Sequence, residues 1–290
     1  MAGFTVNDVI AKHVSESMNM GQVMLIRGLF ATLFVSLLAW HQGALRSPRF
    51  ALQPLVALRV LSEAGATITF LIALSKLPIA NVSAVLQALP LAVTMGAALV
   101  YDERVGWRRW LAIGAGFAGV TVIVRPGFEG FNAYAVLVLV CVGFCAVRDL
   151  ATKRIPSEIP SLFISTMTAS AVTTCGVVLV QPMGGWTPPA AADVSLLACG
   201  AVLLLVGYQF IIMAMRAGEI SFVAPFRYTA LLWAILLGFL VFGDVPDLPM
   251  IAGATIIVGS GLYTLYRERV VGRSKAAAES TGPAMAPEGL

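Results

Sequence analysis

The chain has 290 residues, of which 59% are hydrophobic and only 12% charged, and its formal net charge is +4. A soluble domain carries about 25% charged residues, so the composition excludes a single soluble core. The positive charge does not indicate nucleic-acid binding, because the basic residues lie between apolar runs, where they act as topology signals. Repeated apolar runs of roughly 18 residues or more predict a membrane protein with several spans.

Ten spans are expected, all of them helical because an isolated strand cannot satisfy its backbone hydrogen bonds in lipid. Proline, glycine and charged residues separate them. The expected ranges are 1–14, 20–41, 54–75, 78–101, 106–124, 131–152, 159–181, 191–215, 219–243 and 248–267. The first would rise only about 21 Å, against a hydrocarbon core of about 30 Å, so we expect a truncated first helix.

The fourth span combines a central proline, Pro90, with few polar residues and no charge. Ser83, Gln87 and Thr94 fall on the same side of this helix. Pro90 also frees a backbone carbonyl beside them. Two interpretations are open: the polar groups line a cavity, or they form hydrogen bonds to neighbouring helices.

The sequence contains an internal duplication at an offset of 141 residues (149 − 8), at which Asp8 falls on Asp149 and Lys12 on Lys153. Further identical pairs at this offset are Ala73 and Ala214, Ile79 and Ile220, Val82 and Val223, Leu91 and Leu232, Leu99 and Leu240, and Val100 and Val241. One register from the first span to the fourth indicates a true repeat.

Each repeat would hold five helices, and an odd number gives the second repeat the opposite orientation in the membrane. The sequence therefore predicts an inverted repeat, an architecture common among secondary transporters. We expect a first repeat at 1–125, a second at 131–268 and a disordered cytoplasmic tail at 269–290. Glycine-rich faces in the fifth span (Gly114, Gly116, Gly119) and in the tenth (Gly253, Gly259, Gly261) predict close helix packing.

The distribution of basic residues predicts that both termini are cytoplasmic. With that orientation the outer loops carry Lys12, Lys76 and Arg125. The thirteen basic residues of the inner loops and tail are Arg46, Arg49, Arg104, Arg108, Arg109, Arg148, Lys153, Arg154, Arg216, Arg267, Arg269, Arg273 and Lys275.

Ionisable residues inside the spans are candidates for a solute site, because charges in a bilayer are costly. Arg59 and Glu63 stand four residues apart and can pair; they either neutralise each other or present a carboxylate to a cavity. Arg227, followed by Tyr228, either binds an anionic group of a solute or pairs with Glu63 or Asp149.

Other polar residues complete the candidate set. Tyr208 and Gln209 in the eighth span and Trp233 in the ninth offer stacking and hydrogen bonds. Asp8 and Asp149 are interpreted as interfacial pairs with the lysines four residues on. Arg27 is interpreted as a structural arginine that reaches the interface or a helix C-terminus.

An enzyme is not expected, since no set of residues converges on catalytic spacing. The two histidines have no ligand partner at a useful spacing, and the four cysteines are expected as free thiols in apolar spans. We therefore expect no catalytic residue, metal, cofactor or nucleic-acid partner. The expected partners are a small-molecule solute and the lipid bilayer, and the sequence leaves the oligomeric state open.

The chain resembles the drug/metabolite transporter superfamily and, within it, the ten-span EamA-type transporters. The resemblance covers residues 5–268 and rests on the arginine within 25–30, on 88–91, on 102–105 before the glycine-rich fifth span, and on the repeat. The second copy departs from it, because Leu231 replaces the central proline and Asp244 stands where glutamate is usual.

The resemblance implies a central cavity between the first to fourth and sixth to ninth helices, with the fifth and tenth peripheral. It implies an inner-membrane secondary transporter in a bacterium that works by alternating access. The whole sequence looks similar to the riboflavin importers of the family, so riboflavin uptake is the specific expectation. Export of amino acids or other metabolites is the alternative; an embedded enzyme or a structural membrane protein is a remote one.

Overall fold

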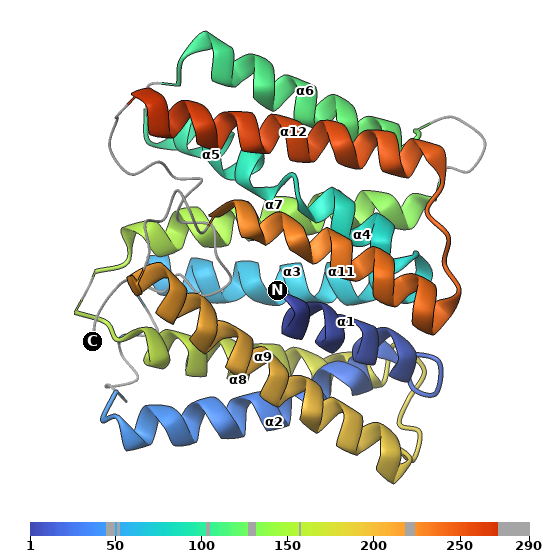
Figure 1. Cartoon of the computed structure of the whole chain (residues 1–290). Coiled ribbons are helices and arrows are strands. Elements are labelled where there is room, and N and C mark those ends of the chain that lie inside the picture. The colour runs from blue at the N-terminus through green and yellow to red at the C-terminus, as the bar shows by residue number, and fades with distance from the viewer. Residues whose placement is uncertain are drawn as a thin grey trace.

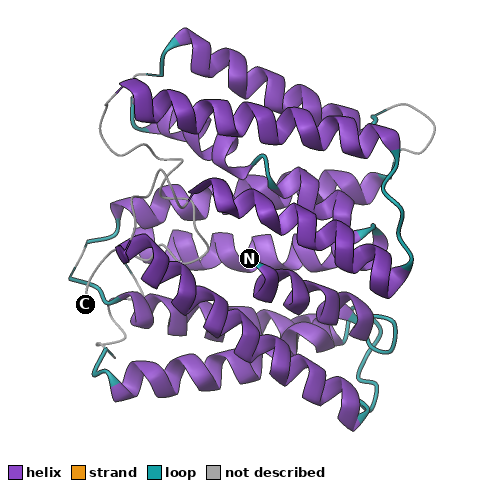
Figure 2. Ribbon diagram, in the orientation of Figure 1, coloured by secondary structure: helices purple, strands orange, loops and turns teal. Residues whose placement is uncertain are grey.

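The computed structural model is helical throughout the part of the chain it describes, which confirms the predicted all-α class (Figures 1 and 2). It describes residues 1–290 apart from 45–49, 51–52, 103–104, 127–131, 157, 218–223 and 272–290. The side chains of 208–209, 211–217, 224–225 and 268–271 also lie outside the described part.

The helices follow the predicted spans closely. They are α1 (Ala2–Val14), α2 (Met20–His41), α3 (Pro54–Lys76), α4 (Ile79–Leu86), α5 (Leu89–Val100), α6 (Trp107–Val124), α7 (Ala133–Arg154), α8 (Ser161–Val180), α9 (Ala191–Ala217), the 3-10 turn η2 (Ala224–Tyr228), α11 (Thr229–Leu237), the π segment η3 (Gly238–Phe242) and α12 (Leu248–Val271). The last helix runs to Val271, so 269–271 of the predicted tail are helical, and the rest of that prediction, 272–290, lies outside the described residues.

Six helical stretches of the described chain are long and apolar enough to cross a membrane. They are Met20–His41, Pro54–Lys76, Ile79–Val100, Ala133–Arg154, Ser161–Val180 and Leu248–Arg267. Shorter apolar helices occupy Ala191–Gly207 and Phe226–Phe242. The chain is therefore a multi-pass membrane protein, as its composition predicts.

The fourth span is divided into α4 and α5, which meet at Gln87. Pro90 lies in the first turn of α5 and has no N–H to donate to the carbonyl of Leu86, so the regular helical hydrogen bonding is interrupted. Before it the chain tightens into a turn, since the amide of Gln87 is shared between the carbonyls of Ser83 and Ala84, each at 3.2 Å, and that of Ala88 donates to the carbonyl of Val85 at 3.0 Å. The proline thus produces a break with Gln87 at its centre.

Helices from the two halves of the chain pack in pairs, namely α2 with α8, α3 with α7, α6 with α12 and α1 with α9 (Figure 1). Glycines permit the closest approaches. A Cβ added at Gly176 would lie 2.6 Å from the backbone nitrogen of Leu25, and one at Gly119 would lie 2.8 Å from the carbonyl oxygen of Gly253. The backbones of α2 and α8, and of α6 and α12, are therefore in contact, as small residues at helix interfaces permit.

The fourth and sixth spans form the interior of the bundle. The most apolar window of Ile79–Val100 is 67% buried and that of Ala133–Arg154 is 61% buried, against 33% for Met20–His41. The outer helices expose large apolar side chains such as Leu33, Leu61 and Leu240, as lipid contact requires. Polar groups on α4, α5 and α7 therefore lie in the middle of the molecule.

Candidate solute-binding site

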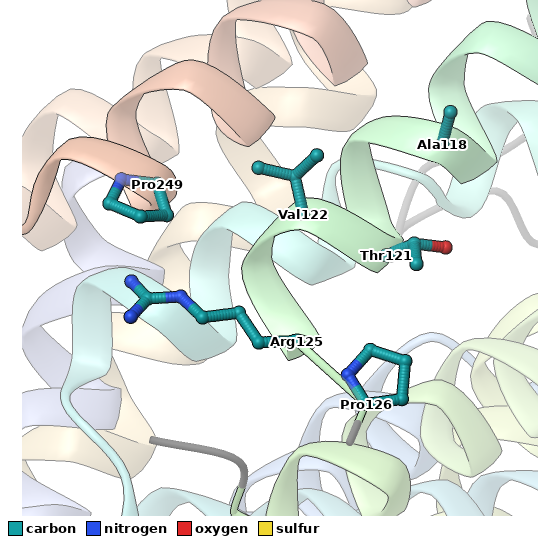
Figure 3. Close-up of a pocket in the computed structure, with 6 residues that line it drawn as sticks. All are labelled: Ala118, Thr121, Val122, Arg125, Pro126 and Pro249. Carbon is teal, nitrogen blue, oxygen red and sulfur yellow. The ribbon is translucent and has the colours of Figure 1, made fainter. Parts of the chain in front are cut away.

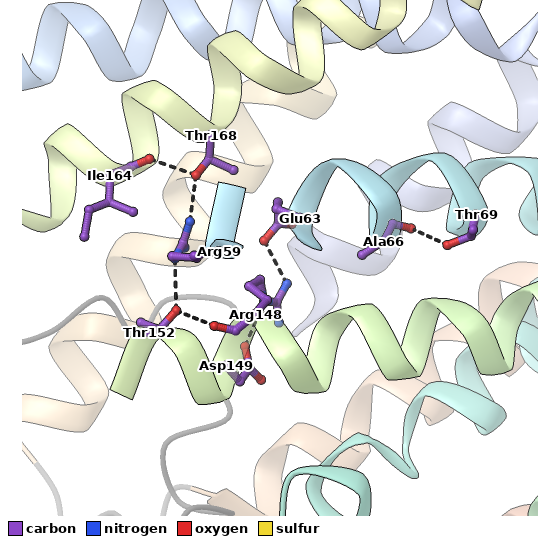
Figure 4. Close-up of polar contacts among 9 residues, drawn as sticks. All are labelled: Arg59, Glu63, Ala66, Thr69, Arg148, Asp149, Thr152, Ile164 and Thr168. Carbon is purple, nitrogen blue, oxygen red and sulfur yellow. Dashed lines mark hydrogen bonds and ion pairs between the residues drawn. The ribbon is translucent and has the colours of Figure 1, made fainter. Parts of the chain in front are cut away.

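The interface between α3 and α7 holds a buried group of charges, shown in Figure 4. Arg148 donates from Nη1 to Glu63 Oε2 at 3.0 Å and from Nε to Asp149 Oδ1 at 2.8 Å. Arg148 and Asp149 are 9% and 6% exposed. One guanidinium therefore bridges two carboxylates, one from each half of the chain, inside the bundle.

Arg59, the second arginine of the interface, is buried and bonds to hydroxyl groups of the second half (Figure 4). Its Nε donates to Thr152 Oγ1 at 3.0 Å and its Nη1 to Thr168 Oγ1 at 2.7 Å. Thr152 in turn donates to the backbone carbonyl of Arg148 at 2.7 Å. The charge of Arg59 also acts on Glu63, as the spacing predicts, while its hydrogen bonds run from α3 to α7 and α8. We call Arg59, Glu63, Arg148, Asp149 and Thr152 the charge cluster.

Asp149 has an oxygen available to a further group. Its Oδ1 accepts from Arg148, whereas Oδ2 is buried and accepts no hydrogen bond from the residues that the structure describes. A buried carboxylate oxygen without a donor is costly. The charge of Arg227, in η2, interacts with that of Asp149, so the start of the ninth span borders the cluster. Arg227 was predicted for the site, and it lies beside it.

The polar residues of the fourth span are only partly brought together. Gln87 lies at the helix break and is 9% exposed, and Ser83 is half-buried one turn earlier. Thr94 is buried, but its hydroxyl donates to the carbonyl of Pro90 at 2.9 Å, within its own helix. Gln87 is therefore the strongest of the three candidates.

Two predicted residues of the ninth span face away from the cluster. Tyr228 is buried against α12, where its ring packs with Val258 and Leu265, and its hydroxyl would meet a Cβ added at Gly261 at 1.9 Å. Trp233 is 40% exposed on the outside of α11. The side chains of Tyr208 and Gln209, predicted from α9, lie outside the described residues.

Sequence reasoning missed the central residue of the cluster. The charge distribution counts Arg148 with the inner loops, but it lies within α7 and is buried. The adjacent pair Arg148–Asp149 in an apolar stretch was the available signal. The expected pairing of Lys12 with Asp8 is also wrong, because the ion pair of Lys12 is with Asp244 at 3.6 Å.

A pocket on α6 does not belong to this site (Figure 3). It is lined by Ala118, Thr121, Val122, Arg125, Pro126 and Pro249. The lining is almost entirely apolar, and the guanidinium of Arg125 pairs with Asp247. This pocket lies on the outer surface of the α6 and α12 pair, where lipid contact is expected.

Comparison with known proteins gives the family. The model of the EamA-like transporter family matches residues 1–125 and 132–266. A chain in a crystal structure aligns with a TM-score of 0.63 at 17% identity, covering 93% of this chain and 97% of the other. At that identity the structural likeness establishes the fold alone.

Three curated relatives are transporters. The chain is 26% identical over 273 residues to an S-adenosylmethionine uptake transporter of Rickettsia prowazekii, covering 91% of this chain and 89% of the relative. It is 34% identical over 183 residues to a riboflavin transporter of Vibrio cholerae, covering 62% and 60%. It is 26% identical over 263 residues to a pseudopaline exporter of Pseudomonas aeruginosa, covering 88% and 89%. The resemblance inferred from the sequence is confirmed, and the chain belongs to the EamA-like transporter family.

Proposed function

We propose that this protein is a secondary transporter of a bacterial inner membrane, which moves a small polar metabolite by alternating access. Two five-helix halves of opposite orientation rock about the charge cluster, which binds the solute between them. The observation that carries this proposal is the buried Oδ2 of Asp149, which lies beside the bridging Arg148 and accepts no hydrogen bond from the described residues. A solute with a cationic or N–H group would supply the missing donor.

The packing of the helices supports an inverted repeat of ten spans. In two halves related by a two-fold axis, a residue on the axis meets its own copy. The hydroxyls of Thr32 and Thr173, which are 141 residues apart, are in contact at 3.0 Å. The same offset places α2 on α8 and α6 on α12, and both of these pairs pack together. The offset found in the sequence thus recurs as contacts between the halves.

The charge distribution supports cytoplasmic termini. Because Arg148 is buried in α7, the inner loops and tail lose one of their thirteen basic residues and keep twelve, against three outside. The excess of basic residues on the inner side therefore remains after Arg148 is removed from the count. With this orientation the charge cluster lies somewhat toward the cytoplasmic side, since Glu63 is in the first half of α3 and Asp149 in the last third of α7.

The chemistry of the cluster supports a solute that carries charges of both signs. Arginines offer donors to a carboxylate, and Asp149 offers an acceptor to an ammonium group. S-adenosylmethionine carries both groups, and the relatives that import it match nearly the whole chain. S-adenosylmethionine uptake is therefore the first candidate.

Riboflavin uptake is the second candidate. It is supported by the 34% identity to the Vibrio cholerae riboflavin transporter, although that match covers less of the chain. Riboflavin carries no net charge, so its binding would depend on neutral hydrogen-bonding groups such as Gln87 and Ser83. Growth of a riboflavin auxotroph at low external riboflavin tests this candidate directly.

Transport assays in proteoliposomes test the proposal as a whole. Labelled S-adenosylmethionine, riboflavin, amino acids and nucleosides are offered with and without a pH gradient, in both directions, because export as in the pseudopaline relative is the alternative. We expect saturable transport of one class, and a strong reduction in Glu63→Gln and Arg227→Ala with normal membrane insertion. Failure of every class to move would contradict the proposed function.

A further inference from the structure

Two lysine–aromatic pairs lie at opposite ends of the bundle. The ammonium of Lys12 lies 4.9 Å from the ring centre of Phe242, and that of Lys153 lies 6.0 Å from the ring centre of Tyr101. The lysines are 141 residues apart, and so are the aromatic residues (242 − 101). Each pair joins the two halves of the chain. The two pairs therefore occupy equivalent positions in the repeat, with the lysine and the aromatic residue exchanged between the halves.

The Lys12 end is held by several contacts of a nearly buried ammonium group. Lys12 Nζ donates to the carbonyl oxygen of Leu77 at 2.6 Å and lies 3.6 Å from Asp244 Oδ2, and its side chain is 14% exposed. Leu77 follows α3, and Asp244 follows η3. One side chain therefore ties α1 to the α3–α4 connection of its own half and to the η3–α12 connection of the other.

The two halves are also joined near the Lys12 end by hydrogen bonds between uncharged groups. Gln22, fully buried at the start of α2, donates to the carbonyl oxygen of Thr187 at 2.5 Å and accepts from its amide at 3.1 Å. Asn19 donates to the carbonyl oxygen of Gly185 at 2.5 Å. These bonds join the two halves at this end of the bundle.

The Lys153 end is closed more loosely by the equivalent elements. The hydroxyl of Tyr101 donates to the carbonyl oxygen of Leu150 at 2.6 Å, and the guanidinium carbon of Arg154 lies 4.1 Å from the ring centre of Tyr101. Lys153 and Arg154 are both exposed, whereas Lys12 is not. Cation–π contacts gain strength when the cation is desolvated, so the Lys12 end is the firmer of the two.

The C-terminal ends of α1 and α7, which carry the two lysines, lie on opposite sides of the bundle in Figure 1. In the proposed alternating-access cycle, a solute that binds at the charge cluster enters at one of these ends and leaves at the other. We propose that Lys12 with Phe242 and Lys153 with Tyr101 are the paired gates of the transport path, each closed when the other is open. The pairing rests on the proposed function, because a transport cycle is what would alternate the gates.

Cysteine accessibility in the purified full chain tests the gates without any solute. Ile79→Cys reports on the Lys12 end, since Ile79 is 2% exposed and packs against Gly238 of the other half. Leu150→Cys reports on the Lys153 end, since Leu150 is 8% exposed and packs against Gly96. The measured quantity is the rate at which a water-soluble maleimide labels each reporter cysteine. The labelling of the native cysteines is measured separately and subtracted.

In Lys12→Gln and Phe242→Leu we expect labelling at position 79 to rise about fivefold or more and labelling at 150 to fall, because weakening one closed state shifts the population toward the other. Tyr101→Leu is expected to do the reverse. Lys76→Gln is the matched control, since Lys76 is an exposed lysine next to Leu77 and should change neither rate.

Unchanged labelling at position 79 in both Lys12→Gln and Phe242→Leu would overturn the proposal. Equal increases at 79 and 150 would also overturn it, because they indicate a loosened bundle and not a shift between gates. Size-exclusion profiles confirm that each variant is folded. A failure of all solutes to move in proteoliposomes would count against the proposed function and would leave the labelling result valid for the gates.

Discussion

The α3/α7 interface and the α1/α9 interface occupy equivalent places at an offset of 141 residues, yet they carry different chemistry. The first interface is polar, at Arg59, Glu63, Arg148, Asp149 and Thr152. The positions of the second at the same offset are mostly small or apolar: Gly200, Leu204, Asn7, Asp8 and Ala11. Both interfaces pack closely, but at these five matched positions only the α3/α7 interface has charges of both signs.

We propose that this difference separates what the fold requires from what the solute requires. Helix pairing needs no charge, because α1 packs on α9 with a glycine where α3 has Arg59. Pairing of helices therefore does not depend on charges like those of the α3/α7 interface, and we propose that these charges, which are costly in a bilayer, serve the solute. Only the acid at Asp8 and Asp149 is kept in both copies. Substitutions at matched positions of the two interfaces test this view.

Replacement of Arg148 by methionine is expected to have the largest effect. It leaves the carboxylates of Glu63 and Asp149 buried without their shared partner, and breaking a buried ion pair costs about 3–5 kcal/mol. We expect a large fall in the detergent unfolding temperature together with loss of transport. Asn7→Ala, at the matched position of α1, is the control and should lower stability by about 1 kcal/mol or less.

A triple variant distinguishes stability from function at the same place. Replacing Glu63, Arg148 and Asp149 together by leucine, methionine and leucine removes every charge of the bridge, and such replacements are often neutral or stabilising. We expect the unfolding temperature to recover while transport stays absent. Recovery of transport in the triple variant would show that the bridge is a structural device.

Asp149→Asn is expected to reduce transport about tenfold or more with little loss of stability. The amide keeps the shape and one acceptor for Arg148, but it removes the charge that Oδ2 offers to a solute donor, an interaction worth about 1.5–3 kcal/mol. Initial uptake rates over a range of solute concentrations measure the effect. Asp8→Asn is the matched substitution in the first copy, and an equal loss there would contradict the assignment of the site to one interface.

Most of the fold could be predicted from the sequence, because the bilayer leaves few choices for an apolar chain. Helix boundaries followed from proline, glycine and charge, and Pro90 marked the break between α4 and α5. The candidate site was harder to predict, because its residues come from helices that are distant in the sequence. Spacing predicted the interaction of Glu63 with Arg59 on one helix, but it could not predict that Arg148 of α7 donates to the same carboxylate.

Thr152→Val is expected to have a moderate effect that depends on Arg59. Valine keeps the volume of the side chain but removes the oxygen that accepts from Arg59 Nε at 3.0 Å. A lost hydrogen bond to a charged group costs about 1–3 kcal/mol, and Arg59 keeps Thr168 as an acceptor, so we expect the lower end of that range. Thermal unfolding in detergent measures it. Thr174→Val, an exposed threonine that bonds only within its own helix, is the matched control.

Tyr228→Phe is expected to have the smallest effect, and it decides between the sequence-based and the structural assignment of this residue. The hydroxyl of Tyr228 is buried without a hydrogen-bond partner against the glycine-lined face of α12. Removing a buried polar group that makes no bond is neutral or slightly stabilising, by about 1 kcal/mol or less. Transport should be unchanged, because the ring packs on the peripheral helix and not on the charge cluster. A loss of solute affinity in Tyr228→Phe with unchanged stability would instead place this hydroxyl in the solute path, as the sequence suggested, and would require a transport state in which the start of the ninth span turns away from α12.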